Sequence, residues 1–133
     1  MEIADVGAIG PVHAAKLGAA GVGSTTDLIE RASTHVARHR LSLDTGIREA
    51  LLLRWANYVD LVEIEGVGQE YAGLLEAAGV SCTEELAQRD PQRLAESMAD
   101  VIAARATVRH VPEAGEIAYW VAQAFRRTDR VEQ

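Results

Sequence analysis

The stretch IEGVGQEYAGLLEAAG, residues 64–79, decides the fold of this chain. Its first five residues follow the pattern hydrophobic–x–Gly–hydrophobic–Gly, and apolar residues then recur at 71, 74, 75 and 78, which is helical spacing. Two glycines this close together permit a tight turn between helices, because glycine adopts positive φ without a steric penalty. The stretch therefore predicts a turn in which at least one of Gly66 and Gly68 has positive φ, followed by a helix that ends at Gly79.

The same pattern occurs earlier in the chain. Residues 6–31, VGAIGPVHAAKLGAAGVGSTTDLIER, align with residues 64–89 at an offset of 58 without a gap, and ten of the 26 positions are identical. Trp55 and Trp120 give a weaker match near the ends of the two copies. We therefore expect two similar units, residues 1–60 and 61–133, which no Gly/Ser-rich or Pro-rich linker separates and which form one fused domain.

The remaining segments also have helical signals. Pro11 suits the first turn of a helix. Ser24 with Asp27 forms a capping-box pattern, and Ser81 with Glu84 repeats it. Further helices are predicted over 34–43 and 47–61, with Gly46 between them, over 91–105 after the cap Asp90, and from about Pro112 onward. Convincing period-2 strands are absent from the sequence, so the expected fold class is all-α.

Composition narrows the class of protein. The 133 residues are 48% hydrophobic but only 5% aromatic, which suits a core of closely packed helices. A single cysteine excludes an intramolecular disulfide framework and a cysteine-rich zinc site. The first residues lack the basic start and apolar run of a secretory signal, and apolar runs are too short to span a bilayer. We expect a soluble, cytoplasmic protein without a membrane partner.

Charge is distributed unevenly along the chain. The total is −7, of which residues 1–60 carry −1 and residues 61–133 carry −6. Residues 31–54 are the exception, with a net charge of +3 from Arg31, Arg38, Arg40, Arg48 and Arg54 against Asp44 and Glu49. If the chain binds a nucleic acid, this segment is the expected contact and the second half is not.

The glycine pattern resembles the helix-hairpin-helix motif. In that motif the N–H groups of the turn and of the following helix form an anion site that holds a nucleic-acid phosphate without reading sequence. The resemblance implies that this phosphate site is formed by Gly66 and Gly68 in the second copy of the motif. In the first copy it is formed by Ile9 and Gly10, and Ala8 replaces the first glycine.

The resemblance extends over about residues 3–127. The blocks IGPVHAAKL at 9–17, TGI at 45–47, WANYVDL at 55–61, EGVGQEYAGLLEAAGV at 65–80, ELAQRDP at 85–91 and the Val-Pro…Trp…Ala pattern at 111–124 are similar to a bacterial family. Its members are tandem helix-hairpin-helix proteins catalogued as a domain of unknown function. The resemblance implies nucleic-acid binding by analogy of fold.

Two functions stay open. In the first, a non-enzymatic module binds the DNA or RNA backbone weakly through Ile9, Gly10, Lys16, Arg31, Arg38, Arg40, Gly66 and Gly68. In the second, the chain is a protein-interaction or assembly module in which the hairpins are purely structural, a reading favoured by the net charge and by Glu63, Glu65 and Glu70 around the second turn.

Other constellations predict no chemistry. His35 and His39 share a helix face without a third ligand, so we expect a solvated basic face and no metal. Cys82 lacks a neighbouring base and is expected to be inert. The aromatic residues in helical segments, Trp55, Tyr58, Tyr71, Tyr119 and Trp120, are expected in the core. Without a nucleophile–base pair or a nucleotide loop, neither enzyme activity nor a cofactor is predicted.

Overall fold

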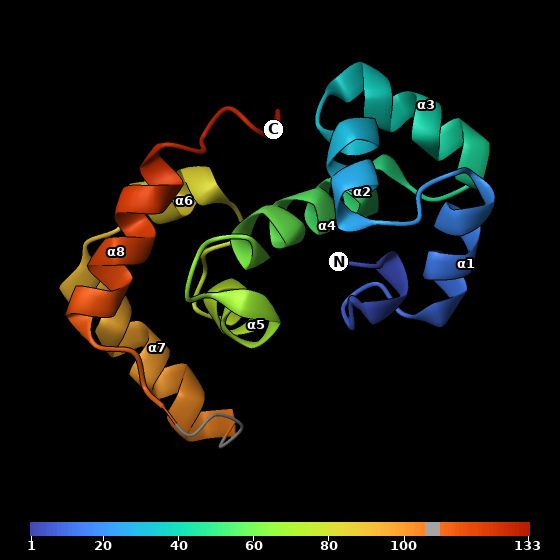
Figure 1. Ribbon diagram of the computed structural model, residues 1–133. Helices are drawn as coiled ribbons and strands as arrows, with labels where there is room; N and C mark the ends of the chain where they lie inside the picture. Colours follow the sequence, from blue (N-terminus) through green and yellow to red (C-terminus); the bar gives the residue numbers. More distant parts are fainter. Residues whose placement is uncertain (106–109) are drawn as a thin grey trace. The chain divides into compact units, whose positions relative to one another are not determined.

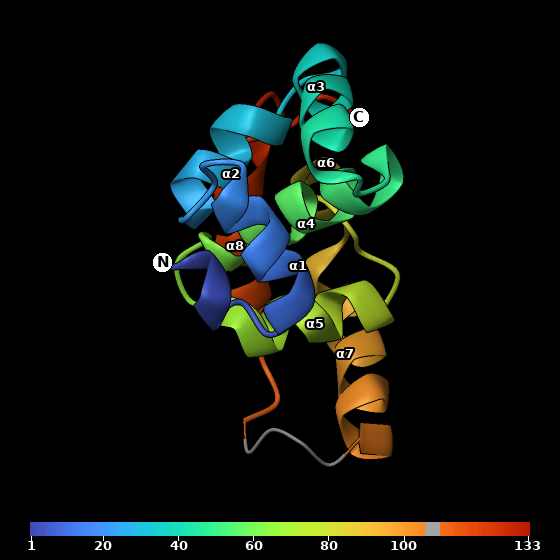
Figure 2. The same cartoon turned by 90° about the vertical axis from the view of Figure 1, so that its right-hand side faces the viewer.

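A computed structural model describes residues 1–105 and 110–133. Over these residues the fold is all-helical, with eight α-helices, one short 3-10 helix and no strand (Figures 1 and 2). The elements are η1 (Ile3–Asp5), α1 (Pro11–Ala19), α2 (Thr25–Ala32), α3 (His35–Thr45), α4 (Glu49–Val62), α5 (Gly68–Ala77), α6 (Thr83–Ala87), α7 (Pro91–Arg105) and α8 (Ala114–Phe125). The predicted all-α class is confirmed.

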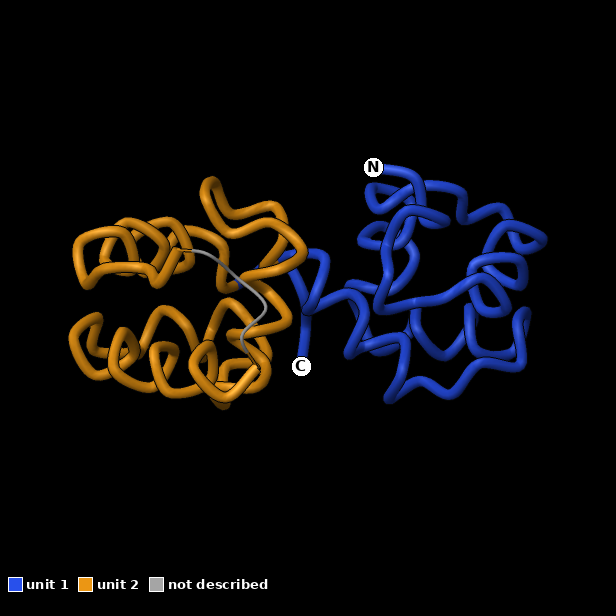
Figure 3. Tube along the Cα trace, turned by 90° about the horizontal axis from the view of Figure 1, so that it is seen from below, with its two compact units in different colours: residues 1–60, 129–133 blue, residues 61–128 orange. Residues whose placement is uncertain are grey.

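The chain forms two compact units, which Figure 3 distinguishes by colour. Unit 1 contains residues 1–60 and 129–133, and unit 2 contains residues 61–128. Residues 129–133 thus follow unit 2 in the chain but belong to unit 1.

The helices of unit 1 begin and end at the predicted signals. Gly10 precedes Pro11 at the start of α1, and Ser24 and Asp27 form a complete capping box at the start of α2. At the end of α1, Gly21 has a φ of +89° and the N–H of Val22 reaches the carbonyl of Leu17 at 2.8 Å. This bond satisfies a helix-terminal carbonyl that would otherwise lack a partner. The break at Gly46, with a φ of +74°, separates α3 from α4.

Unit 2 repeats these features 58 residues later. Gly79 has a φ of +92°, and the N–H of Val80 bonds to Leu75 at 2.8 Å, as Val22 does to Leu17. Within the unit, α8 packs against α6 and α7 (Figure 1). The cores correspond as well, since the fully buried side chains include the aligned pairs Leu17/Leu75, Val22/Val80 and Leu28/Leu86.

One predicted cap is wrong. Cys82, not Ser81, occupies the N-cap position of α6, and Glu85, not Glu84, reaches back to the preceding residues. The Ser81 hydroxyl and backbone N–H both donate to the Glu85 carboxylate. Position 82 aligns with Ser24, the cap of the first unit, so α2 and α6 start at the same position of the repeat.

Candidate nucleic-acid interface

The two glycine turns are built on the same backbone. In unit 1 the N–H of Val6 bonds to Ile3 and that of Ile9 bonds to Val6, both at 3.1 Å. At an offset of 58, Ile64 bonds to Leu61 at 3.1 Å and Val67 bonds to Ile64 at 3.0 Å. These six apolar residues are all buried, so each turn is fastened to its unit by three side chains.

A positive-φ glycine follows each of these turns and starts the next helix. Gly10 has a φ of +79° and Gly68 a φ of +65°, and a Cβ at either position would meet nothing within 4 Å. Neither α1 nor α5 has a side-chain cap at its N-terminus. Amide groups in the first turn of a helix that no side chain caps favour an anion.

The first turns of α1 and α5 differ in charge. That of α1 contains no acidic residue, its Val12 is 67% exposed, and the exposed Lys16 follows in its last turn. That of α5 contains the exposed Glu70. A carboxylate within a few ångströms of a phosphate offsets the attraction of the amides.

Helix α8 and the residues that follow it contact the second glycine turn, while Glu65, Gly66 and Gly68 stay exposed. Gln123 exchanges two hydrogen bonds with the backbone of Glu65, at 2.9 and 3.2 Å, and the Tyr119 hydroxyl donates to the Glu65 carboxylate at 2.8 Å. Arg127 pairs with Glu63 at 2.8 Å. A Cβ on Gly66 would lie 2.9 Å from the indole nitrogen of Trp120. Gly66, a predicted binding residue, therefore lies against a side chain of its own unit.

Arg31 holds the end of a helix. Its guanidinium donates to the carbonyl of Ala20 at 3.1 Å, just after α1, and lies 3.5 Å from the Asp44 carboxylate. Arg89, the aligned residue, donates to the carbonyl of Gly79 at 3.1 Å. Arg31 binds a carbonyl at the end of α1, and Arg89 binds a carbonyl at the end of α5. The arginine therefore has the same structural role in each unit.

The expectation that Arg38 is a surface cation is wrong. The side chain is only 2% exposed, and its guanidinium donates to the backbone carbonyls of Ala32, at 2.8 Å, and of Glu132. Burial lowers the pKa of this guanidinium. The sequence alone could not reveal this contact, because it depends on a segment 94 residues further along the chain.

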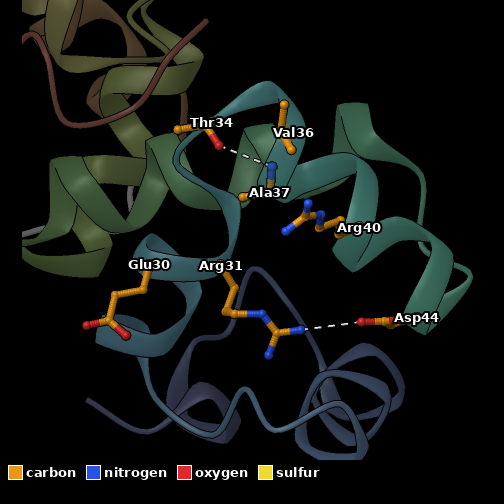
Figure 4. Close-up of a pocket in the computed structure, with 7 residues that line it drawn as sticks. All are labelled: Glu30, Arg31, Thr34, Val36, Ala37, Arg40 and Asp44. Carbon is orange, nitrogen blue, oxygen red and sulfur yellow. Dashed lines mark hydrogen bonds and ion pairs between the residues drawn. The ribbon is translucent and has the colours of Figure 1, made fainter.

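Arg40 is, with Lys16, one of the two predicted cations that the structure leaves exposed. It is exposed and points into a groove of about 330 Å³ between α2 and α3, which Arg31 and Thr34 also line (Figure 4). Within the part of the chain that the structure describes, Arg40 has neither a hydrogen bond nor an ion pair. The groove thus brings two of the predicted arginines, Arg31 and Arg40, together with the carboxylates of Glu30 and Asp44.

An exposed apolar stripe on α3 was not predicted from the sequence. Val36 and Leu43 are 63% and 73% exposed and, with Arg40, occupy positions i, i+4 and i+7. Residues at this spacing lie on one face of a helix, and the buried Leu41 lies on another face. The spacing of Val36, Arg40 and Leu43 in the sequence could therefore have predicted the stripe.

The aromatic residues are divided between core and surface. Trp55, Tyr58 and Trp120 are buried as expected, whereas Tyr119 is 52% exposed, which corrects its predicted place in the core. His13 packs on Trp55 with ring centroids 5.0 Å apart, and Tyr71, the residue aligned with His13, packs on Trp120 at 5.5 Å.

Burial raises the pKa of Cys82, which opposes formation of the reactive thiolate.

This is a two-unit all-helical protein with an uncapped, exposed helix start in unit 1. The family model described as "Domain of unknown function (DUF4332)" matches residues 7–127, and the chain belongs to this family. Searches of curated proteins and of solved structures found no match. Among the residues described, none of the helices combines the length and apolar character needed to cross a bilayer.

Proposed function

We propose that each unit is a helix-hairpin-helix unit and that unit 1 binds the backbone of DNA or RNA weakly, without reading sequence and without catalysing a reaction. The observation that carries the proposal is the start of α1, which is uncapped, exposed and free of acidic residues in its first turn. Such a helix start attracts a phosphate through its N–H groups and the helix dipole.

Two exposed cations support the same function. Lys16 lies on α1 and Arg40 lies in the groove between α2 and α3. Each can neutralise one phosphate and release a counterion, so the binding constant should fall with salt at a log–log slope of roughly −2. Glu70 and the contacts of α8 argue against phosphate binding at the second turn.

Fluorescence anisotropy with labelled single- and double-stranded oligonucleotides at low salt tests this function. Lys16→Glu and Arg40→Glu should each weaken binding several-fold, while Arg93→Glu, the same charge reversal at an exposed site of unit 2, should change it less. Equal losses of affinity in all three variants would show that binding depends on the net charge of the chain and not on the positions of Lys16 and Arg40. Absence of binding at about 100 μM protein, where nonspecific affinity is normally detectable, would eliminate the function.

The exposed stripe on α3 favours a second candidate, a protein-interaction module. Val36 and Leu43 flank Arg40 on one helix face, and partner surfaces commonly combine exposed apolar side chains with arginine, which is enriched at interfaces. Val36→Ser with Leu43→Ser should abolish capture of a protein partner and leave oligonucleotide binding unchanged. If the double variant instead lost oligonucleotide binding, the stripe would belong to the nucleic-acid interface.

A further inference from the structure

Residues 129–133 place a carboxylate at the N-terminus of α3. The backbone N–H of Glu132 bonds to the carbonyl of Ser33 at 2.7 Å, and its carboxylate accepts the N–H of His35 at 2.8 Å. The imidazole of His35 lies 3.6 Å from the same carboxylate. Arg38 donates to the backbone carbonyl of Glu132. A helix N–H, an imidazole and a guanidinium thus meet around Glu132.

Two further contacts hold this segment in place. Val131 is 4% exposed, so its side chain is buried. Gln133 and Asn57 exchange a pair of amide hydrogen bonds at 3.0 and 2.9 Å, and Asn57 is itself buried. The segment covers Arg38, the arginine that the charge pattern had placed on the surface.

We propose that residues 129–133 are an autoinhibitory strap: the Glu132 carboxylate occupies the N-terminus of α3 at His35, the Glu132 backbone carbonyl occupies the guanidinium of Arg38, and a nucleic-acid phosphate reaches these two groups only after the strap is displaced. A carboxylate that accepts hydrogen bonds at a helix N-terminus takes a position that suits a phosphate oxygen equally well. The inference rests on the proposed function, because it takes its ligand class from there.

Competition of this kind multiplies the apparent affinity by the fraction of molecules in which the strap is open, so a small open fraction means weak binding. A strap that is closed about 99% of the time weakens phosphate binding about a hundredfold, and a variant that opens it only partly recovers part of that factor. Opening it adds Arg38 to the exposed cations Lys16 and Arg40, so the salt dependence of binding should also become steeper.

The test uses Val131→Ser with Gln133→Ala, a pair that loosens the strap without changing the charge of the chain. Anisotropy with a labelled single-stranded oligonucleotide should show roughly tenfold tighter binding or more. In NMR spectra the Nε–H signal of Arg38 should shift on adding the oligonucleotide in this variant and not in the native chain. The control pair Val111→Ser with Gln92→Ala, at exposed sites of unit 2, should match the native protein.

If circular dichroism shows that the loosened variant is unfolded, Glu132→Gln replaces it, compared with Glu2→Gln, which makes the same charge change elsewhere in unit 1. Equal affinity in the strap variant and its control, or an unshifted Arg38 signal, overturns the strap. A gain in affinity that Lys16→Glu does not diminish supports the strap but contradicts the site on α1. Binding in none of the variants overturns both.

Discussion

At the scale of single residues, Gly66 is constrained more tightly than Gly68. Both have positive φ, but only Gly66 faces a neighbour, the indole of Trp120, 2.9 Å from the position of a Cβ. Gly66→Ala should therefore cost about 2–5 kcal/mol of unfolding free energy, from backbone strain and from the clash. Gly68→Ala should cost about 1–2 kcal/mol, from strain alone. Chemical denaturation of the two variants measures the difference.

Gly73→Ala is the matched control for this comparison. Gly73 lies within α5, has no positive φ and has open space around its Cβ position, so alanine should stabilise the helix by about 0.5–1 kcal/mol. A smaller cost at Gly66 than at Gly68 would mean that Trp120 moves aside freely and that the turn is not held by α8.

The capping box of α2 should make the unfolding free energy depend on pH in the acidic range. Hydrogen bonds from the backbone N–H of Gly23 and from Ser24 lower the pKa of Asp27 below its ordinary value of 3.8. Because the pKa is lower in the folded state, the charged carboxylate stabilises the fold above pH 3.8, and this contribution is lost as the pH falls through the folded pKa. The stability difference between the native chain and Asp27→Asn should therefore be larger at pH 6 than at pH 2.5. A difference that stays constant over this range would show that the charge of Asp27 does not matter.

At the scale of elements, one arginine in each unit fastens the end of a helix. Arg89→Met keeps the apolar stem but removes the bond to the carbonyl of Gly79, and should lower the unfolding free energy by about 1 kcal/mol. Arg31→Met should have a similar effect through Ala20. Urea denaturation checks both variants, with Arg93→Met as the control. If neither variant differed from that control, the two bonds would be incidental to stability.

The elements also show how far the sequence predicts this protein. Helix boundaries could be predicted because their signals are local: Pro11, the Ser24–Asp27 box, and glycines at helix ends. The role of Arg38 could not be predicted from the sequence. Its partner Glu132 lies 94 residues away in the chain and reaches the guanidinium only in the folded protein. Likewise, the aligned Arg31 and Arg89 could be read as cations, but not as partners of helix carbonyls.

At the scale of the whole molecule, residues 129–133 belong to unit 1 although they follow unit 2 in the chain. Deleting them exposes the Val131 site and leaves Asn57 and Arg38 each without a partner present in the native fold. We expect a loss of about 2–4 kcal/mol of stability. Hydrogen exchange should speed up in α3 and α4 more than in α7 and α8. Uniform acceleration across both units would contradict this assignment of the segment.

We expect the start of α1 to hold a nucleic-acid phosphate and the start of α5 not to hold one. An NMR titration of the native chain with a short oligonucleotide at low salt tests this residue by residue. We expect shifts in the backbone N–H signals of Val12 and His13, with little change at Gln69 and Glu70. Shifts at the start of α5 that equal or exceed those at α1 would contradict this expectation, as would the absence of shifts at both.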